Sequence, residues 1–112
     1  HGAATFAGTS SSWSVTGDSS VDLSDGNWHH IVVVADRSGL PQIYTDTIAG
    51  STSNISSISS DNISNSTNFT IIKNFGVATG VIVDEMGLWN RALTGTEIST
   101  LYNSGTGKSY PF

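Results

Sequence analysis

The sequence predicts an all-β fold: an antiparallel β-sandwich with one short α-helix near the C-terminus, at about residues 95–103. Along most of the chain, short apolar stretches alternate with clusters of Gly, Asn, Asp and Ser, which is typical of strands joined by turns. The segment 28–36 is apolar on both faces, as expected for a strand in the middle of a layered structure. Apolar residues at helical spacing occur only near the end of the chain.

The composition restricts both the size of the protein and the class of its partners. With 112 residues the chain predicts one domain, and without cysteine its core depends on hydrophobic packing. Nine acidic residues and four basic ones give a net charge of -5, which argues against nucleic acid as a partner. No apolar run is long enough to cross a bilayer, so we expect no membrane insertion. The chain opens with His1 rather than methionine, and we expect a trimmed product or a piece of a longer protein.

Three short strands are expected in the first part of the chain, at 4–6, 12–17 and 20–24. The segment Asp25-Gly26-Asn27 follows them. Its residues tolerate positive φ, which predicts a tight hairpin leading into the next strand.

The strand at 28–36 has the strongest pattern in the sequence. Its even and its odd positions are both apolar, so we expect it to be covered on two sides within the sandwich. The residues of one face are Trp28, Val32 and Val34, and those of the other are Ile31, Val33 and Ala35.

The middle of the chain predicts a hairpin, a loop and two further strands. After a break at 37–41, the segment 42–50 is expected to return as a hairpin partner. Residues 51–68 are nearly all Ser, Asn and Ile, so we expect a long Ser/Asn-rich surface loop. The segments 69–75 and 80–89 predict strands before the pattern becomes helical.

The helix is predicted to begin with a capping box formed by Thr94 and Glu97. The Thr94 hydroxyl can accept a hydrogen bond from the Glu97 backbone N–H, while the Glu97 carboxylate accepts one from the Thr94 backbone N–H. Leu93 and Ile98 would form the accompanying hydrophobic staple, and Gly105 stands where a helix stops.

One face of this helix carries Ile98, Leu101 and Tyr102, at spacings of three and four residues. So short a helix is marginal in water by itself. We therefore expect the apolar face to dock on the β-sandwich.

Four stretches carry a likeness to a known family: DGNWHHIVVVADRSG, QIYTDTIAG, FTIIKNF and GVIVDEMGLWNRALTGTEISTLYNSG. Together they resemble the second half of a laminin-G-like, or concanavalin A-like, jelly roll, the fold shared with pentraxins and legume-type lectins. The last stretch is the most specific, because a strand, Trp-Asn-Arg-Ala-Leu and a capped helix occur in the family's order. The resemblance runs from Asp25 to Gly105 and implies a single jelly-roll domain over residues 1–112.

The chain departs from the family pattern in two places. Its hairpin has Asp46-Thr47 where the family has Asp-Gly, and because threonine resists positive φ we expect a wider turn. Complete family domains carry several strands between an opening that GAATFAG at 2–8 resembles and the Trp-His-His strand, so this domain is expected to be shortened or a fragment. A half sandwich exposes an apolar face and strand edges. We therefore expect other protein subunits, or a homo-oligomer, to complete the core.

Asp84 and Glu85 are adjacent acids on opposite faces of an expected strand, so they cannot serve as the carboxylate pair of a glycosidase. Asp84 shares its face with Met86 and Leu88, which are expected in the core, and a buried carboxylate needs a partner. Two interpretations remain for Asp84. It is either structural, bound by backbone N–H groups, by Arg91 or by a histidine, or a calcium ligand near the rim of the sandwich.

His29 and His30 are expected on opposite faces of their strand, so one metal ion could not readily take both. A structural role is favoured, and the sequence contains no zinc-ligand spacing. The residues with expected structural roles are Trp28, His30, Arg91, Thr94 and Glu97.

Aromatic side chains are the usual platforms for sugar rings, while nearby polar groups bind the hydroxyls. The candidate ligand-binding residues are Trp13, Tyr44, Trp89 and, at the rim, Asp46.

The sequence thus predicts a recognition module without enzymatic activity, which binds a glycan or a protein surface. A Ser/Thr-rich, cysteine-free, charge-poor chain suits an extracellular or virion surface, such as that of a phage or a bacterium. The alternative is a purely structural decoration or fibre domain that packs against other subunits and has no small ligand. A third interpretation, an accessory domain of a glycoside-active enzyme, requires a neighbouring catalytic domain.

Overall fold

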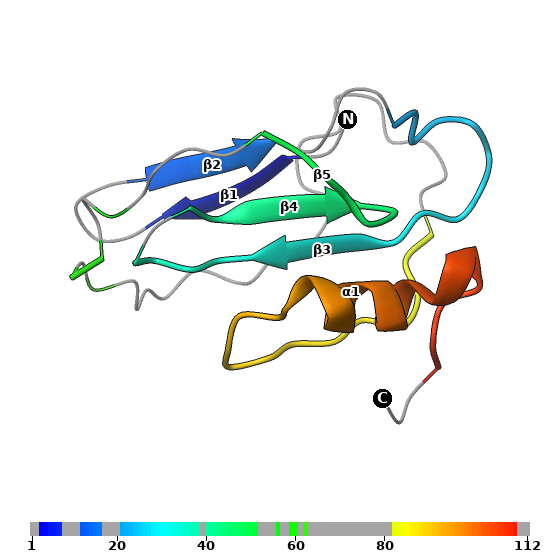
Figure 1. Ribbon diagram of the computed structural model, residues 1–112. Coiled ribbons are helices and arrows are strands. Elements are labelled where there is room, and N and C mark those ends of the chain that lie inside the picture. Colours follow the sequence, from blue (N-terminus) through cyan, green and yellow to red (C-terminus); the bar gives the residue numbers. More distant parts are fainter. Residues whose placement is uncertain are drawn as a thin grey trace.

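The computed structural model of the chain describes residues 3–7, 12–16, 21–38, 40–51, 56, 59–60, 62 and 82–109. These residues form two antiparallel sheets, one α-helix and short turns (Figure 1). Antiparallel β-structure with a C-terminal helix agrees with the predicted fold class.

The first sheet is a hairpin of β1 (Ala3–Ala7) and β2 (Ser12–Thr16). The strands are antiparallel, with Ala3 opposite Thr16 and Ala7 opposite Ser12. The strands expected at 4–6 and 12–17 are therefore confirmed.

The second sheet has the strand order β3-β4-β5, with β3 at Ile31–Val34, β4 at Gln42–Thr45 and β5 at Ile48–Ala49. All three strands are antiparallel neighbours. Tyr44 in the central strand lies opposite Val32 on one side and Ala49 on the other. The hairpin partner expected at 42–50 is thus present, divided between β4 and β5.

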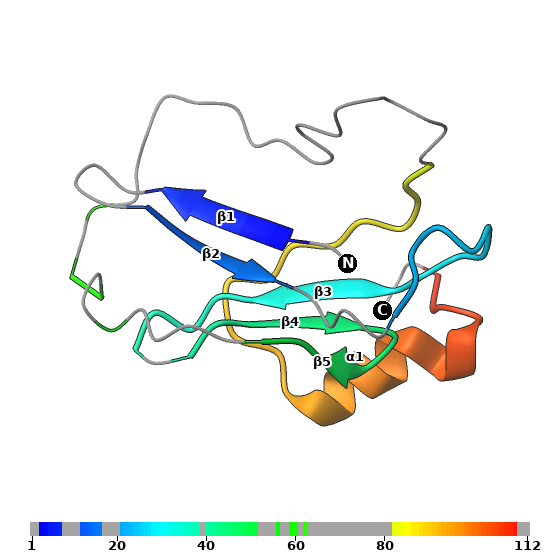
Figure 2. The ribbon, with the colours of Figure 1, turned by 90° about the horizontal axis from the view of Figure 1, so that it is seen from above.

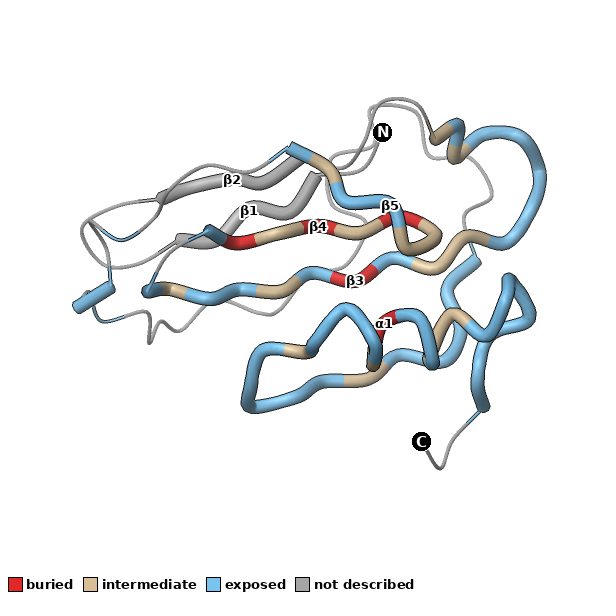
Figure 3. Tube along the Cα trace, in the orientation of Figure 1, coloured by how far each residue is buried: buried red, intermediate tan, exposed pale blue. Residues whose placement is uncertain are grey.

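The helix and the β1–β2 hairpin lie on different sides of the three-stranded sheet (Figures 1 and 2). The buried apolar side chains among the described residues include Ile43 on β4, 2% exposed, and Ile98 on the helix, 1% exposed (Figure 3). The Tyr102 ring lies 6.0 Å from the His30 ring, between centroids. The helix therefore docks by the face that the sequence predicted.

Helix α1 spans Gly95–Tyr102 and begins with the predicted capping box. Thr94 Oγ1 accepts from the Glu97 backbone N–H at 3.3 Å, and Glu97 Oε2 accepts from the Thr94 backbone N–H at 2.8 Å. Arg91 donates to both Glu97 oxygens, at 2.6 and 2.9 Å, which ties the incoming chain to the first turn. The helix ends at Asn103, whose φ of 47° is left-handed, and its N–H donates to the Ser99 carbonyl oxygen.

The prediction of a strand at 28–36 covered on both faces is wrong. The strand begins only at Ile31, it has a neighbour on one side alone among the described strands, and Ile31 and Val33 are exposed. Trp28, expected in the core, lies before the strand and is 66% exposed. The apolar pattern identified the strand, but the position of a strand within a sheet depends on distant partners.

The strand expected at 20–24 is also absent, because residues 21–27 form turns and bends. Asp22 Oδ1 accepts from the Ser24 backbone N–H at 2.8 Å, and Asp25 Oδ1 does the same for Asn27 at 2.8 Å. Such local bonds from Asp to a backbone N–H two residues on compete with a strand ladder. Gly26 has a φ of 83°, so the tolerance for positive φ that the sequence indicated is used here.

The strand expected at 80–89 does not form over residues 82–89, the part of that segment described. Glu85 has a φ of 52°, a left-handed conformation that interrupts an extended chain. Met86 and Leu88 are exposed, so the expectation that they lie in the core is wrong.

The remaining expectations fall on other parts of the chain. The strand expected at 69–75 and most of the loop expected at 51–68 lie outside the described residues. Within the described part of the chain, no helix has the length and apolar character needed to cross a bilayer.

The turn between β4 and β5 is tight, so the expectation of a wider turn is wrong. Thr45 pairs directly with Ile48, which leaves a two-residue loop. Both loop residues have positive φ, 50° at Asp46 and 71° at Thr47, as hairpin turns of this length require. A β-branched residue in this region is strained, and the Asp46 side chain described below provides compensating hydrogen bonds.

We expect Thr47→Gly to raise the free energy of unfolding by about 1 kcal/mol, because glycine adopts positive φ without the steric cost of a Cβ. Urea denaturation monitored by circular dichroism measures the change. Thr47→Ala is the matched control, since it keeps the Cβ and should leave stability nearly unchanged. A Thr47→Gly protein less stable than the wild type would contradict the strain assigned to this turn.

Candidate functional site

The most strongly connected polar cluster lies at the end of the three-stranded sheet where β3 begins and β4 ends. Here the loop 21–30, called the rim loop below, meets the Asp46–Thr47 turn (Figure 1). The Asp46 backbone N–H donates to the His30 carbonyl oxygen at 2.9 Å. The rim loop and the hairpin turn are therefore held together through their backbones.

His29 lies between two carboxylates. Its Nδ1 is 2.6 Å from Asp46 Oδ2 and its Nε2 is 3.0 Å from Asp25 Oδ1, and its side chain is only 12% exposed. The second oxygen of Asp46 accepts from the His30 backbone N–H at 2.9 Å. We call Asp25, His29 and Asp46 the histidine clamp. Asp46, expected as a rim residue for a ligand, is thus engaged in bonds within the protein.

The rim loop is further fixed by its own side chains. Asp25 Oδ2 accepts from Asn27 Nδ2 at 2.9 Å, in addition to the backbone bond from the same residue. Asp22 Oδ1 also accepts from Ser24 Oγ at 2.6 Å. The turn at 22–24 and the turn at 25–27 are therefore each closed by a carboxylate. The histidine clamp connects the turn at 25–27 to the hairpin turn after β4.

These contacts shift the pKa values of the clamp in opposite directions. The hydrogen bond to Asp46, and secondarily that to Asp25, raises the pKa of His29 above its ordinary value of 6.5. Hydrogen bonds from Asn27, followed by the bond from His29, lower the pKa of Asp25 to about 2. Both ring nitrogens of His29 face carboxylate oxygens, an arrangement that suits an imidazolium with two N–H donors. The geometry of the clamp therefore suits a protonated His29 between two carboxylates.

We expect the stability that the clamp contributes to be greatest between about pH 4 and pH 6.5. Because folding raises the pKa of His29, its contribution to the free energy of unfolding is complete below pH 6.5 and is lost as the pH rises through the folded-state pKa. Because folding lowers the pKa of Asp25, its contribution to the free energy of unfolding is complete above pH 3.8 and is lost as the pH falls toward 2. The difference in melting temperature between wild type and His29→Gln should therefore be a few degrees in this window and smaller on either side.

Thermal melts of both proteins across this range measure that difference, in which contributions of other groups cancel. A difference that grows steadily above pH 8 would contradict a protonated His29 in the clamp.

His30 lies toward the helix and behaves differently from its neighbour. Its ring faces that of Tyr102 at an interplanar angle of 39°, and its Nδ1 is buried without a hydrogen-bond partner among the described residues. Burial lowers the pKa of His30, so a neutral imidazole is favoured there. His30 therefore occupies the contact between the sheet and α1, while His29 faces the rim.

The aromatic residues proposed from the sequence as sugar platforms do not form one group. The backbone of Trp13 lies in β2 opposite Phe6, and the placement of its side chain is outside the described part of the structure. Tyr44 is half-buried in the central strand. The Trp89 ring lies against Gly87, where an added Cβ would come within 2.5 Å of Cη2 of that ring.

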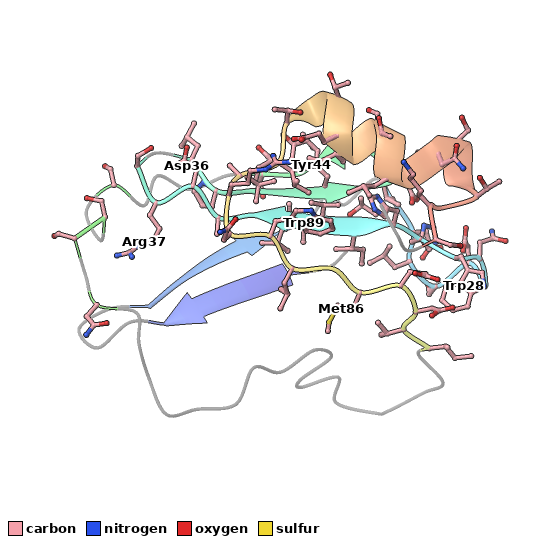
Figure 4. The ribbon with its side chains drawn as sticks, turned by 90° about the horizontal axis from the view of Figure 1, so that it is seen from below. Trp28, Asp36, Arg37, Tyr44, Met86 and Trp89 are labelled. Atoms are coloured by element: carbon pink, nitrogen blue, oxygen red, sulfur yellow. The ribbon has the colours of Figure 1, made fainter. Side chains whose placement is uncertain are left out.

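Trp28 is the aromatic residue that sequence reasoning assigned to the wrong place. It lies in the rim loop beside the clamp, at the end of the molecule away from Asp36 and Arg37 (Figure 4). A signal was present in the sequence, since Trp28 directly follows the turn residues Asp25-Gly26-Asn27 and a residue beside a tight turn is often exposed. The structure thus places an exposed indole next to fixed carboxylate and amide groups.

Comparison with protein families gives one match. Residues 1–99 match a laminin G family model described as the concanavalin A-like lectin/glucanases superfamily. The chain belongs to this superfamily. The match covers 99 of the 112 residues and confirms the resemblance recognised in the sequence.

Comparison with other proteins adds a distant structural likeness. An S-layer domain-containing protein from Clostridium thermocellum shares 20% sequence identity, with a TM-score of 0.48. The aligned region covers 80% of this chain and 45% of that one, so the superfamily member described here spans less than half of that structure. No curated protein matches the sequence significantly.

The superfamily's description includes glucanases, which use a pair of carboxylates in one cleft. The placement of Asp84 and Glu85 therefore shows whether these two acids form such a pair. Both are exposed, and Asp84 Oδ1 accepts from the backbone N–H of Glu85 at 2.9 Å. Of the partners considered for a structural Asp84, the structure shows a backbone N–H, that of Glu85, whereas Arg91 binds Glu97. Asp25 and Asp46 contact opposite nitrogens of His29, and in the described part of the chain no group of three His, Asp or Glu side chains is arranged to hold a metal ion. Calcium binding by Asp84 therefore gains no support.

Proposed function

We propose that this member of the superfamily is a non-catalytic recognition module that binds a glycan at its rim loop. One observation carries the proposal: Trp28 presents an indole that is 66% exposed from a loop whose neighbouring polar groups are held in place. An indole buries a large area when a ligand covers it, so an exposed tryptophan beside fixed polar groups is suited to binding.

The chemistry around Trp28 suits a sugar. An aromatic face stacks on the C–H groups of a pyranose ring, and carboxylate or amide groups beside it bind the hydroxyls. Asp22, Asp25 and Asn27 lie within six residues of Trp28 and are all exposed. Their turns are already closed by hydrogen bonds, so little conformational entropy is lost when a ligand binds.

Two features support recognition rather than hydrolysis. Asp25 and Asp46 lie on either side of one ring, but the imidazole of His29 occupies the space that a glycosidic bond and a water molecule would need. Asp84 and Glu85 are on an exposed segment, with one acid bonded to the backbone of the other. The hydroxyl-rich, cysteine-free composition supports display on a cell or virion surface.

A glycan array screened with and without calcium tests this proposal. We expect binding to at least one glycan class, and a loss of about fivefold or more in affinity for Trp28→Ala, since stacking on an aromatic ring contributes about 1 kcal/mol or more. Trp28→Phe should retain part of the affinity.

The matched control is Leu40→Ala, which truncates a side chain that is 57% exposed at the opposite end of β3 and β4. This variant should bind as the wild type does. Equal glycan affinity of Trp28→Ala and Leu40→Ala would show that the ligand does not bind at Trp28. Absence of binding to every glycan on the array would contradict the proposal.

A second candidate function, a structural decoration or fibre domain that packs against other subunits, is favoured by a different observation. Ile82, Val83, Met86 and Leu88 are all exposed on one short segment. Absence of glycan binding together with a stable oligomer would favour this function over recognition.

A further inference from the structure

The two contacts of His29 in the clamp both require an N–H on its ring. Nδ1 lies 2.6 Å from Asp46 Oδ2, and Nε2 lies 3.0 Å from Asp25 Oδ1. An imidazolium donates from both nitrogens, whereas a neutral imidazole has one N–H and one lone pair. Both hydrogen bonds can therefore exist together only while His29 is protonated.

Of the two contacts, the one with Asp25 is the weaker. It is the longer one, and the Asp25 side chain is 37% exposed whereas that of Asp46 is 19% exposed. The other oxygen of Asp46 is fixed by the His30 backbone N–H. A neutral His29 therefore keeps its proton on Nδ1, toward Asp46, and turns the lone pair of Nε2 toward Asp25. A lone pair that faces a carboxylate is repelled, so the contact with Asp25 is the one that is lost.

The contact between Asp25 and His29 closes a short segment that contains Trp28. Residues 25–28 are all exposed, and no described atom lies within 4 Å of the place that a Cβ at Gly26 would take. Polar contacts rather than packing therefore hold this segment. Loss of the Asp25 contact frees the part of the rim loop that presents the indole.

The charged groups that contact His29 in the described part of the chain come from two elements, Asp25 from the rim loop and Asp46 from the hairpin turn. His30 faces Tyr102 on α1 instead. The hydrogen bond to Asp46, followed by that to Asp25, raises the pKa of His29 above 6.5. The pKa of Asp25 is about 2, so its carboxylate stays ionised while His29 titrates. His29 is therefore the group whose titration changes the clamp above pH 6.5.

We propose that His29 is a pH-dependent lock on the ligand site: its protonated form fixes the rim loop around Trp28, and loss of its proton releases residues 25–28. The proposal rests on the proposed function, because it describes the regulation of the same site. When only a fraction of the molecules has a competent site, the apparent affinity falls by that fraction. Glycan affinity should therefore be highest in mild acid and fall as the pH rises.

Backbone order parameters from 13Cα relaxation of the 112-residue chain test the lock without a ligand and without exchangeable protons. We expect the values at Asn27 and Trp28 to fall from about 0.85 to below about 0.6 between about pH 6 and about pH 9. Ser38 is the internal control. Its N–H donates to Asp36 Oδ1 at 2.9 Å, in a similar turn at the end of the molecule away from Trp28 (Figure 4). Its order parameter should not change with pH.

Three variants identify the titrating group. Glutamine does not titrate, so in His29→Gln the order parameters of the rim loop should be independent of pH. Asp25→Asn removes a carboxylate that raises the pKa of His29, and it should move the midpoint of the imidazole titration to lower pH. Asp36→Asn, the matched control, removes the same charge from the similar turn and should leave the midpoint unchanged. Order parameters independent of pH in the wild type, or an equal fall in His29→Gln, would overturn the lock.

The glycan array, screened at about pH 6 and about pH 9, connects the lock to binding. We expect affinity about fivefold weaker at the higher pH in the wild type and equal at both in His29→Gln. Wild-type affinity that is equal at both pH values would overturn the lock and leave the proposed function standing. Absence of binding at either pH would contradict the proposed function, whereas the relaxation measurement would still decide whether His29 controls the loop.

Discussion

The ionic contact of His29 with Asp25 and Asp46 is the constraint on which this end of the molecule depends. It joins the rim loop, which leads into β3, to the hairpin turn after β4, and these two segments are separate in the sequence. Asp46 serves twice, since one oxygen contacts His29 and the other accepts from the His30 backbone. A turn with positive φ at two residues that are not glycine persists because these bonds hold it.

Helix α1 is held by local interactions at its two ends. The capping box and the two bonds from Arg91 to Glu97 fix the start of α1, and the left-handed Asn103 ends it. The Arg91 and Thr94 bonds also lower the pKa of Glu97 to about 2, so this carboxylate stays ionised at any physiological pH. The rim loop and the helix are therefore each held by their own set of hydrogen bonds.

What the sequence could predict follows from the range of the interactions. The capping box spans four residues and the strands at 4–6 and 12–17 show short local patterns, so these could be predicted, whereas the tight turn between β4 and β5 was not, because its geometry depends on the Asp46 bonds to His29 and His30. The burial of Trp28, Met86 and Leu88 depends on which elements lie over them, and apolar alternation says nothing about that. The clamp was missed for a related reason: Asp46 meets His29 only because β3 and β4 pair in one particular register.

The contact of Trp89 with Gly87 has an evolutionary consequence. Any side chain at position 87 would overlap the indole, at distances of 2.5 to 3.2 Å from its ring carbons. The two positions should therefore change together among descendants of the same ancestral gene: lineages that keep the tryptophan keep the glycine, and a larger residue at 87 becomes tolerable only after the ring has been replaced by something smaller.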